Sequence, residues 1–194
     1  MTLLVLGLVL FLGLHSVRIV ADGWRDRSIA RIGPGAWKGL YSVLSVLGFV
    51  LLVWGYGQAR LAPELLWTPP VWTRHLTALL MLGAMVLLVA AYVPRNIFKA
   101  RLRHPMVLSV KLWALAHLLA NGSLADVLLF GSFLVWAVLN FRAARARDRL
   151  AGSPELPSSA AGSVLALALG LLVWGGFAFW AHGWLFGVRP FGGA

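Results

Sequence analysis

Hydrophobic residues are gathered in six long runs that short polar segments separate from one another. The runs cover residues 2–20, 40–59, 73–93, 106–121, 124–141 and 162–187. A helix that crosses a hydrocarbon core of roughly 30 Å needs about 20 apolar residues, and the run at 106–121 is short by this measure. Because backbone polar groups in lipid must be bonded internally, and no strand-like alternation occurs, each run is expected to be a helix. The pattern predicts an all-α, polytopic membrane helix bundle with six transmembrane helices.

Residues 152–162 (GSPELPSSAAG) form the only linker-like stretch, and it separates five of the runs from the last one. One helix is too little to define a second domain, so we expect a single domain over residues 1–194. The first run follows no basic residue and lacks an Ala-x-Ala sequence near its end. A secretory signal would carry both features, so this run is interpreted as a retained helix.

The composition supports a membrane protein. Of the 194 residues, 60% are hydrophobic and 12% are charged, and the mean hydropathy is +0.84. A soluble domain has about 45–50% apolar and about 25% charged residues, so a water-soluble globule and a disordered chain are both excluded. The lack of cysteine excludes disulfides, thiolate metal sites and redox thiols.

Basic residues cluster in alternate connections between the runs. The chain has 17 Lys and Arg against 6 Asp and Glu, which gives a formal net charge of +11. The connections after the first, third and fifth runs, with the run ends beside them, hold all the basic residues except Arg60, Arg74 and Arg189. By the positive-inside rule these connections lie in the cytoplasm and both termini lie outside; five or seven spans would break the alternation.

The net charge therefore reports orientation in the membrane and contact with its lipid bilayer. Nucleic-acid binding would require a basic patch with aromatic residues on a soluble surface, and the sequence offers none. Four glycines within the runs are expected where helices approach closely: Gly48, Gly55, Gly175 and Gly176.

Few ionisable residues fall inside the runs, where such a group is a functional candidate. Of the 6 acidic residues only Asp126 is near a span, so a paired-carboxylate or di-iron site lacks its side chains. The sequence contains no HExxH, P-loop or GxSxG motif. Among the 5 histidines, only His15 and His117 are placed within the apolar slab. The others are expected near span ends: His75, His104 and His182.

A buried neutral imidazole is a good ligand for iron, and two of them on separate helices can hold a haem from either side. His104 and His117 cannot do so from one helix, since the 13 residues between them turn it by about 220°. His15 is nearest to His117 in depth, with an offset of roughly 8 Å that helix tilt would have to absorb. The alternative is that each histidine hydrogen-bonds a neighbouring helix.

The neighbours of both histidines suit such a site. Arg18 lies three residues after His15 on the same helix face, where a guanidinium can bind a haem propionate. Trp113 and Asn121 lie four residues before and after His117, as an aromatic wall and a polar group that could support the ligand.

Two stretches carry a family pattern: LFLGLHSVRIV at 10–20 and RHPMVLSVKLWALAHLLANGSLADVLLFG at 103–131. With them the chain resembles the NnrU family of bacterial membrane proteins over nearly its whole length, and RHPM…W…AHLLANG…LLFG is specific to that family. The resemblance implies a role in denitrification, where NnrU proteins are implicated in the expression or function of nitrite and nitric oxide reductases.

The NnrU family is in turn similar to the plant 15-cis-zeta-carotene isomerase, a membrane enzyme that contains haem b. The haem ligands of that enzyme are a histidine in an early helix and another that follows a further histidine by 13 residues. In this sequence His15 matches the first, and His104 followed by His117 reproduces the spacing. The resemblance therefore implies haem b ligated by His15 and His117.

Residues 103–105 (RHP) also open the signature of isoprenylcysteine-type membrane methyltransferases. In those enzymes a Tyr and a Gly follow shortly, whereas here Met106 follows directly and the next glycine is Gly122. This departure disfavours a methyltransferase.

Three functions remain open. The first is a haem-binding component of nitrite and nitric oxide metabolism, since a bis-histidine ferrous haem that releases one ligand can bind nitric oxide. The second is a haem-dependent cis–trans isomerase of a carotenoid-like polyene, which needs a long apolar slot beside the iron. The third is a haem-free membrane scaffold or assembly factor for a respiratory reductase.

Overall fold

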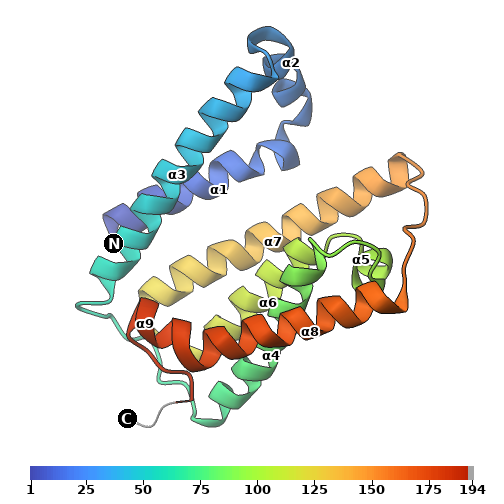
Figure 1. Cartoon of the computed structure of the whole chain (residues 1–194). Coiled ribbons are helices and arrows are strands. Elements are labelled where there is room, and N and C mark those ends of the chain that lie inside the picture. Colours follow the sequence, from blue (N-terminus) through green and yellow to red (C-terminus); the bar gives the residue numbers. More distant parts are fainter. Residues whose placement is uncertain (192–194) are drawn as a thin grey trace. The chain divides into compact units, whose positions relative to one another are not determined.

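The computed structural model describes residues 1–191, so residues 192–194 of the predicted domain lie outside the described part (Figure 1). Its elements in chain order are α1 (Thr2–Val20), α2 (Asp22–Ile32), α3 (Pro34–Ala59), α4 (Trp72–Ala90), α5 (Ile97–Leu102), α6 (Pro105–Ala120), α7 (Leu124–Leu150), α8 (Ala160–Gly176), the π-helix η1 (Phe177–Ala181) and α9 (His182–Phe186). The predicted all-α class is confirmed. Within residues 1–191, strand-like pairing is limited to an isolated bridge between Leu65 and Ser123.

Within residues 1–191, five helical segments are long and apolar enough to cross a membrane: α1, α3, α4, α7 and the continuous segment Ala160–Phe186. The remaining predicted span, 106–121, forms α6, which has 16 residues. This helix begins at Pro105, since proline fits the first helical position, and it ends before Asn121, whose backbone is extended. All six predicted runs are helical, and the count of six spans stays a prediction.

Several helices extend beyond the apolar runs. The run at 40–59 is the later part of α3, which begins at Pro34 directly after Gly33 with φ 83°. The run at 124–141 continues as α7 through an arginine- and alanine-rich segment to Leu150. Alanine, leucine and arginine are good helix formers, so the helix extends beyond the end of the apolar run.

The helix surfaces carry many large apolar side chains that no other part of the described chain covers. Val9 is 67% exposed, Val43 65% and Leu172 70%. A soluble monomer rarely exposes apolar patches of this extent, whereas lipid covers them in a bilayer. The helices therefore form a multi-pass membrane protein.

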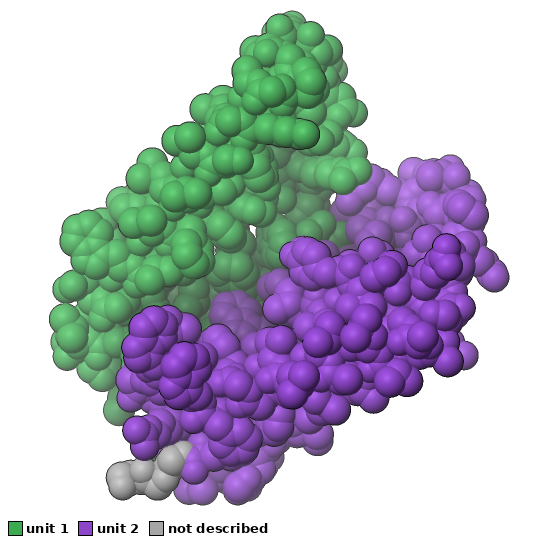
Figure 2. All heavy atoms as spheres, in the orientation of Figure 1, with its two compact units in different colours: residues 1–68, 122–140 green, residues 69–121, 141–194 purple. Residues whose placement is uncertain are grey.

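The chain divides into two compact units (Figure 2). Unit 1 comprises residues 1–68 and 122–140, and unit 2 comprises residues 69–121 and 141–194. The division falls within α7, and each unit is discontinuous in sequence. The assignment of a single domain over residues 1–194 stays a prediction.

In unit 1, α1 and α3 pack so closely that glycine is required between them. A Cβ atom added to Gly55 would meet the backbone of Leu4, and one added to Gly7 would meet the backbone of Leu52. At Gly48 it would lie 2.9 Å from the backbone nitrogen of Phe11. The predicted close approach is confirmed at Gly48 and Gly55.

The same prediction is wrong for Gly175 and Gly176. Apart from the chain neighbours and the nearby backbone of the same helix, no atom of the described chain lies within 4 Å of a Cβ built on either residue. These glycines lie instead at the end of α8, directly before the π-helix η1. A glycine pair beside a π-helical segment is a common place for a helix to change its hydrogen-bond pattern.

Backbone hydrogen bonds join the segment after α3 to the start of α7, within unit 1. Leu66 N donates to Gly122 O at 2.8 Å, and Leu124 N donates to Glu64 O at 2.8 Å. Asp126 adds a side-chain link, because its Oδ1 accepts a hydrogen bond of 2.6 Å from the hydroxyl of Tyr56 in α3. The end of α3 and the beginning of α7 are thereby held at the same end of the unit.

In unit 2, α4 packs against both α6 and α8. Thr77 Oγ1 donates to Ala116 O at 2.9 Å, and Trp174 Nε1 donates to Ala78 O at 3.1 Å. At the end of α4, the fully buried Asn96 donates to two carbonyls of the preceding turn and accepts from Lys99 N at 2.8 Å, which caps α5. These polar contacts fix the helix that carries His117.

Candidate functional site

His15 lies on α1 among aromatic rings of unit 1. Its ring stacks on that of Phe11 with 4.2 Å between the centroids. Tyr41 of α3 and Trp136 of α7 meet the imidazole edge-on, with centroid distances of 5.3 and 6.3 Å. Residues from three helices thus surround one half-buried imidazole.

The Nδ1 atom of His15 is bonded within its own helix. It lies 2.6 Å from the carbonyl oxygen of Phe11, and since a carbonyl oxygen only accepts, Nδ1 carries the proton. In the neutral ring the lone pair is then on Nε2. Metal-ligating histidines are usually oriented by a hydrogen bond of this kind from the other ring nitrogen.

One buried polar atom adjoins this ring. The indole Nε1 of Trp136, whose ring meets that of His15, has no hydrogen-bond partner among residues 1–191. Ser45, one turn after Tyr41 on α3, has the Tyr41 side chain as a hydrogen-bonding neighbour. A buried donor without a partner costs about 1–3 kcal/mol, so the Trp136 indole fits a site whose occupant would accept its hydrogen bond.

An open hollow of about 430 Å³ lies between α1 and α7 in unit 1. Its lining consists of Leu12, Ser16, Gly131, Ser132, Val135, Trp136 and Leu139. Trp136 therefore belongs to both the wall of the hollow and the surroundings of His15. The lining is mostly apolar, which suits a hydrophobic molecule.

His117 lies on α6 in unit 2 and shows the same local geometry as His15. Its Nδ1 lies 2.9 Å from the carbonyl oxygen of Trp113, one turn earlier, so the proton is again on Nδ1. The indole of Trp113 is tilted against the imidazole at 5.4 Å. Asn121 Nδ2 donates to the backbone carbonyl of His117 at 2.8 Å. The predicted neighbours Trp113 and Asn121 both contact His117, the second through the main chain.

The other histidines have different surroundings. His104 Nε2 lies 2.9 Å from Asp148 Oδ2, at the start of α6. His182 Nδ1 lies 2.7 Å from the carbonyl oxygen of Val188, and its ring meets those of Phe177 and Phe186. His75 is exposed at the start of α4. Within residues 1–191 no group of three or more His, Cys, Asp or Glu side chains could hold a metal ion.

Arg18 lies near the end of α1, one turn after His15. Its Nε is 3.9 Å from Asp22 Oδ1, and the guanidinium side chain is 61% exposed. The predicted contact with a haem propionate stays a prediction.

His15 belongs to unit 1 and His117 to unit 2, so the structure describes each histidine among its own neighbours. Their pairing as ligands of one haem stays a prediction. The donor set fits haem, since both rings carry the Nδ1 proton and direct the lone pair of the neutral form to Nε2. Sequence reasoning missed Tyr41, Ser45 and Trp136, although a hydroxyl and an indole in mid-span were a signal for polar groups around His15.

The fold and these intramembrane histidines define a polytopic, all-α membrane protein. The family model for the NnrU protein matches residues 3–190, and the chain belongs to the NnrU family. No curated protein and no solved structure matches it.

Proposed function

We propose that this NnrU-family protein binds haem b between His15 and His117 and serves in nitrite and nitric oxide (denitrification) metabolism, in a bacterial inner membrane. The observation that carries the proposal is the shared geometry of the two intramembrane histidines. Each donates Nδ1–H to the carbonyl four residues earlier, at 2.6 Å for His15 and 2.9 Å for His117. This bond selects the tautomer that ligates through Nε2 and limits rotation of the ring.

If haem is held by His15 and His117, its iron would supply the redox and nitric oxide chemistry. The protein contributes the orientation and the exclusion of water. Phe11 and Trp113 pack against the two imidazoles, and the indole of Trp136 offers a hydrogen-bond donor on the His15 side. Arg18, one turn from His15, would supply a cation for a propionate.

The first experiment is an absorption spectrum of the detergent-purified protein, oxidised and then reduced with dithionite, together with a pyridine haemochrome assay. We expect a haem b spectrum that changes in His15→Ala and His117→Ala, because each substitution removes an axial ligand. His75→Ala is the matched control, since that histidine is exposed, and it should leave the spectrum unchanged.

A colourless protein after expression with ample haem would contradict the proposal. If such a protein co-purifies with a reductase, the scaffold or assembly role would replace it. A spectrum unaffected by His15→Ala and His117→Ala would assign the ligands elsewhere.

A second candidate function is haem-dependent cis–trans isomerisation of a carotenoid-like polyene. The observation that favours it is the apolar hollow of about 430 Å³ whose wall includes Trp136, next to His15. The test is to add a cis-polyene to the reduced protein and follow its absorption. We expect the polyene absorption to shift to the all-trans spectrum. Val135→Trp narrows the hollow, so this variant should slow the shift and leave the haem spectrum unchanged. An unchanged polyene spectrum would contradict the isomerase function and leave the role in nitrite and nitric oxide metabolism as the proposed function.

A further inference from the structure

The helix between the first two spanning helices has no part in the proposed haem site. α2 joins α1 and α3, and both of these are long and apolar enough to cross a membrane. α1 ends at Val20 and α3 begins at Pro34, so α2 is confined to the membrane boundary where the two helices end. None of its residues is buried.

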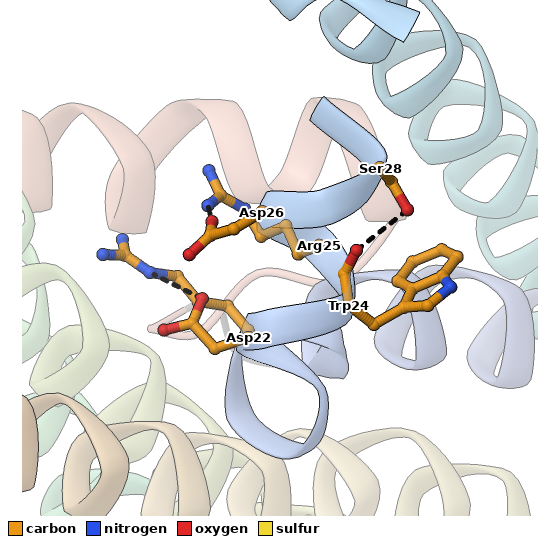
Figure 3. A network of polar contacts seen from close by, with 6 residues as sticks. Asp22, Trp24, Arg25, Asp26 and Ser28 are labelled. Carbon is orange, nitrogen blue, oxygen red and sulfur yellow. Dashed lines mark hydrogen bonds and ion pairs between the residues drawn. The ribbon is translucent and has the colours of Figure 1, made fainter. Parts of the chain in front are cut away.

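The two acidic side chains of this helix are already engaged by arginines (Figure 3). Arg25 Nη1 donates to Asp26 Oδ1 at 2.8 Å, and Asp22 faces Arg18 at 3.9 Å. Both contacts are local, with partners one and four residues apart. The two negative charges of α2 are thereby balanced by arginines that lie close to them in the sequence.

The other side of α2 is basic and aromatic. At 100° per residue, Trp24, Arg27 and Arg31 fall within about 60° of one another around the helix axis. All three are exposed, Trp24 by 52%. Within the described residues no ion pair is found for Arg27 or Arg31. Figure 3 shows Trp24 on the side of the helix away from Asp22 and Asp26.

We propose that α2 lies in the headgroup layer and that Trp24, Arg27 and Arg31 bind the phosphate groups of anionic phospholipids. Tryptophan favours the membrane interface, and arginine binds phosphate with two parallel hydrogen bonds. The positive charges of Arg27 and Arg31 complement an anionic leaflet.

The test is native mass spectrometry of the full-length protein after equilibration in detergent with equal amounts of phosphatidylglycerol and phosphatidylcholine. We expect wild type to retain phosphatidylglycerol preferentially. Each arginine near an anionic surface contributes roughly fivefold to binding, so Arg27→Gln with Arg31→Gln should lower the preference about 30-fold. Arg27→Lys with Arg31→Lys keeps the positive charge and should retain most of the preference for phosphatidylglycerol.

The matched control removes two other exposed arginines, Arg142→Gln with Arg149→Gln on α7, and should change the preference far less. An equal loss in the control, or none in the α2 variant, overturns the proposal. A second measurement does not depend on these variants. Because the chain has no cysteine, Ala30→Cys carries a single spin label, which should lie in the headgroup layer of nanodiscs. A label in bulk water overturns the proposal.

Discussion

Gly55 illustrates how one residue sets the distance between two membrane helices. Its added Cβ would meet backbone atoms of Leu4, and backbone cannot move aside as a flexible side chain can. Membrane helices associate through such close packing, since lipid gives no hydrophobic force between them. Gly57, two residues later on α3, is exposed and has no atom within 4 Å of its Cβ position.

This contrast makes a matched pair of variants. Gly55→Ala forces α1 and α3 apart, and we expect it to lower the free energy of unfolding by about 1–3 kcal/mol, as overpacking does. Gly57→Ala, with the same chemical change, should be neutral or slightly stabilising, since alanine is the better helix former. Thermal unfolding of both purified proteins checks this, and equal effects would show that α1 and α3 do not pack through Gly55.

At the scale of elements, the length of α6 alone does not decide whether this helix crosses the membrane. It has 16 residues, about 24 Å at 1.5 Å per residue. The chain around it nevertheless requires a crossing once α4 spans the membrane. If α4 takes the chain to the face opposite Glu64, the hydrogen bond from Leu124 N to Glu64 O predicts that α6 brings it back. A short helix can cross with little tilt or by local thinning of the bilayer.

Single cysteines in this cysteine-free chain test the crossing. Glu64→Cys, Arg101→Cys and Ser158→Cys are each placed at an exposed residue. With six spans and basic connections inside, an impermeant maleimide labels position 64 in intact cells and positions 101 and 158 only after permeabilisation. Labelling of position 158 together with position 64 would mean that α6 does not cross.

The apolar runs predict every long helix, because lipid requires internal backbone bonding and so leaves few alternatives. They do not predict α2 and α5, whose polar sequences resemble loops. The start of α5 depends on its cap, Asn96. They also miss the π-helix η1, since hydropathy does not report hydrogen-bond register.

For the whole molecule, the sequence can select candidate site residues only because suitable side chains are rare within the apolar runs. Ionisable groups are so few within the runs that His15 and His117 can be selected by position. The contacts of Tyr41 and Trp136 with His15 were not predictable, because they depend on how α1, α3 and α7 pack. Neither was the division of α7 between two units, which no break in hydropathy marks.

The discontinuity of unit 1 has a consequence for biosynthesis. The hairpin of α1 and α3 is complete once residue 59 has left the ribosome, and its glycine contacts need nothing made later. The second segment of unit 1, residues 122–140, follows only after α4 and α6 of unit 2 have been synthesised. Since chains fold as they are made, the aromatic surroundings of His15 stay incomplete through this interval, and Trp136 closes them only when α7 enters the membrane.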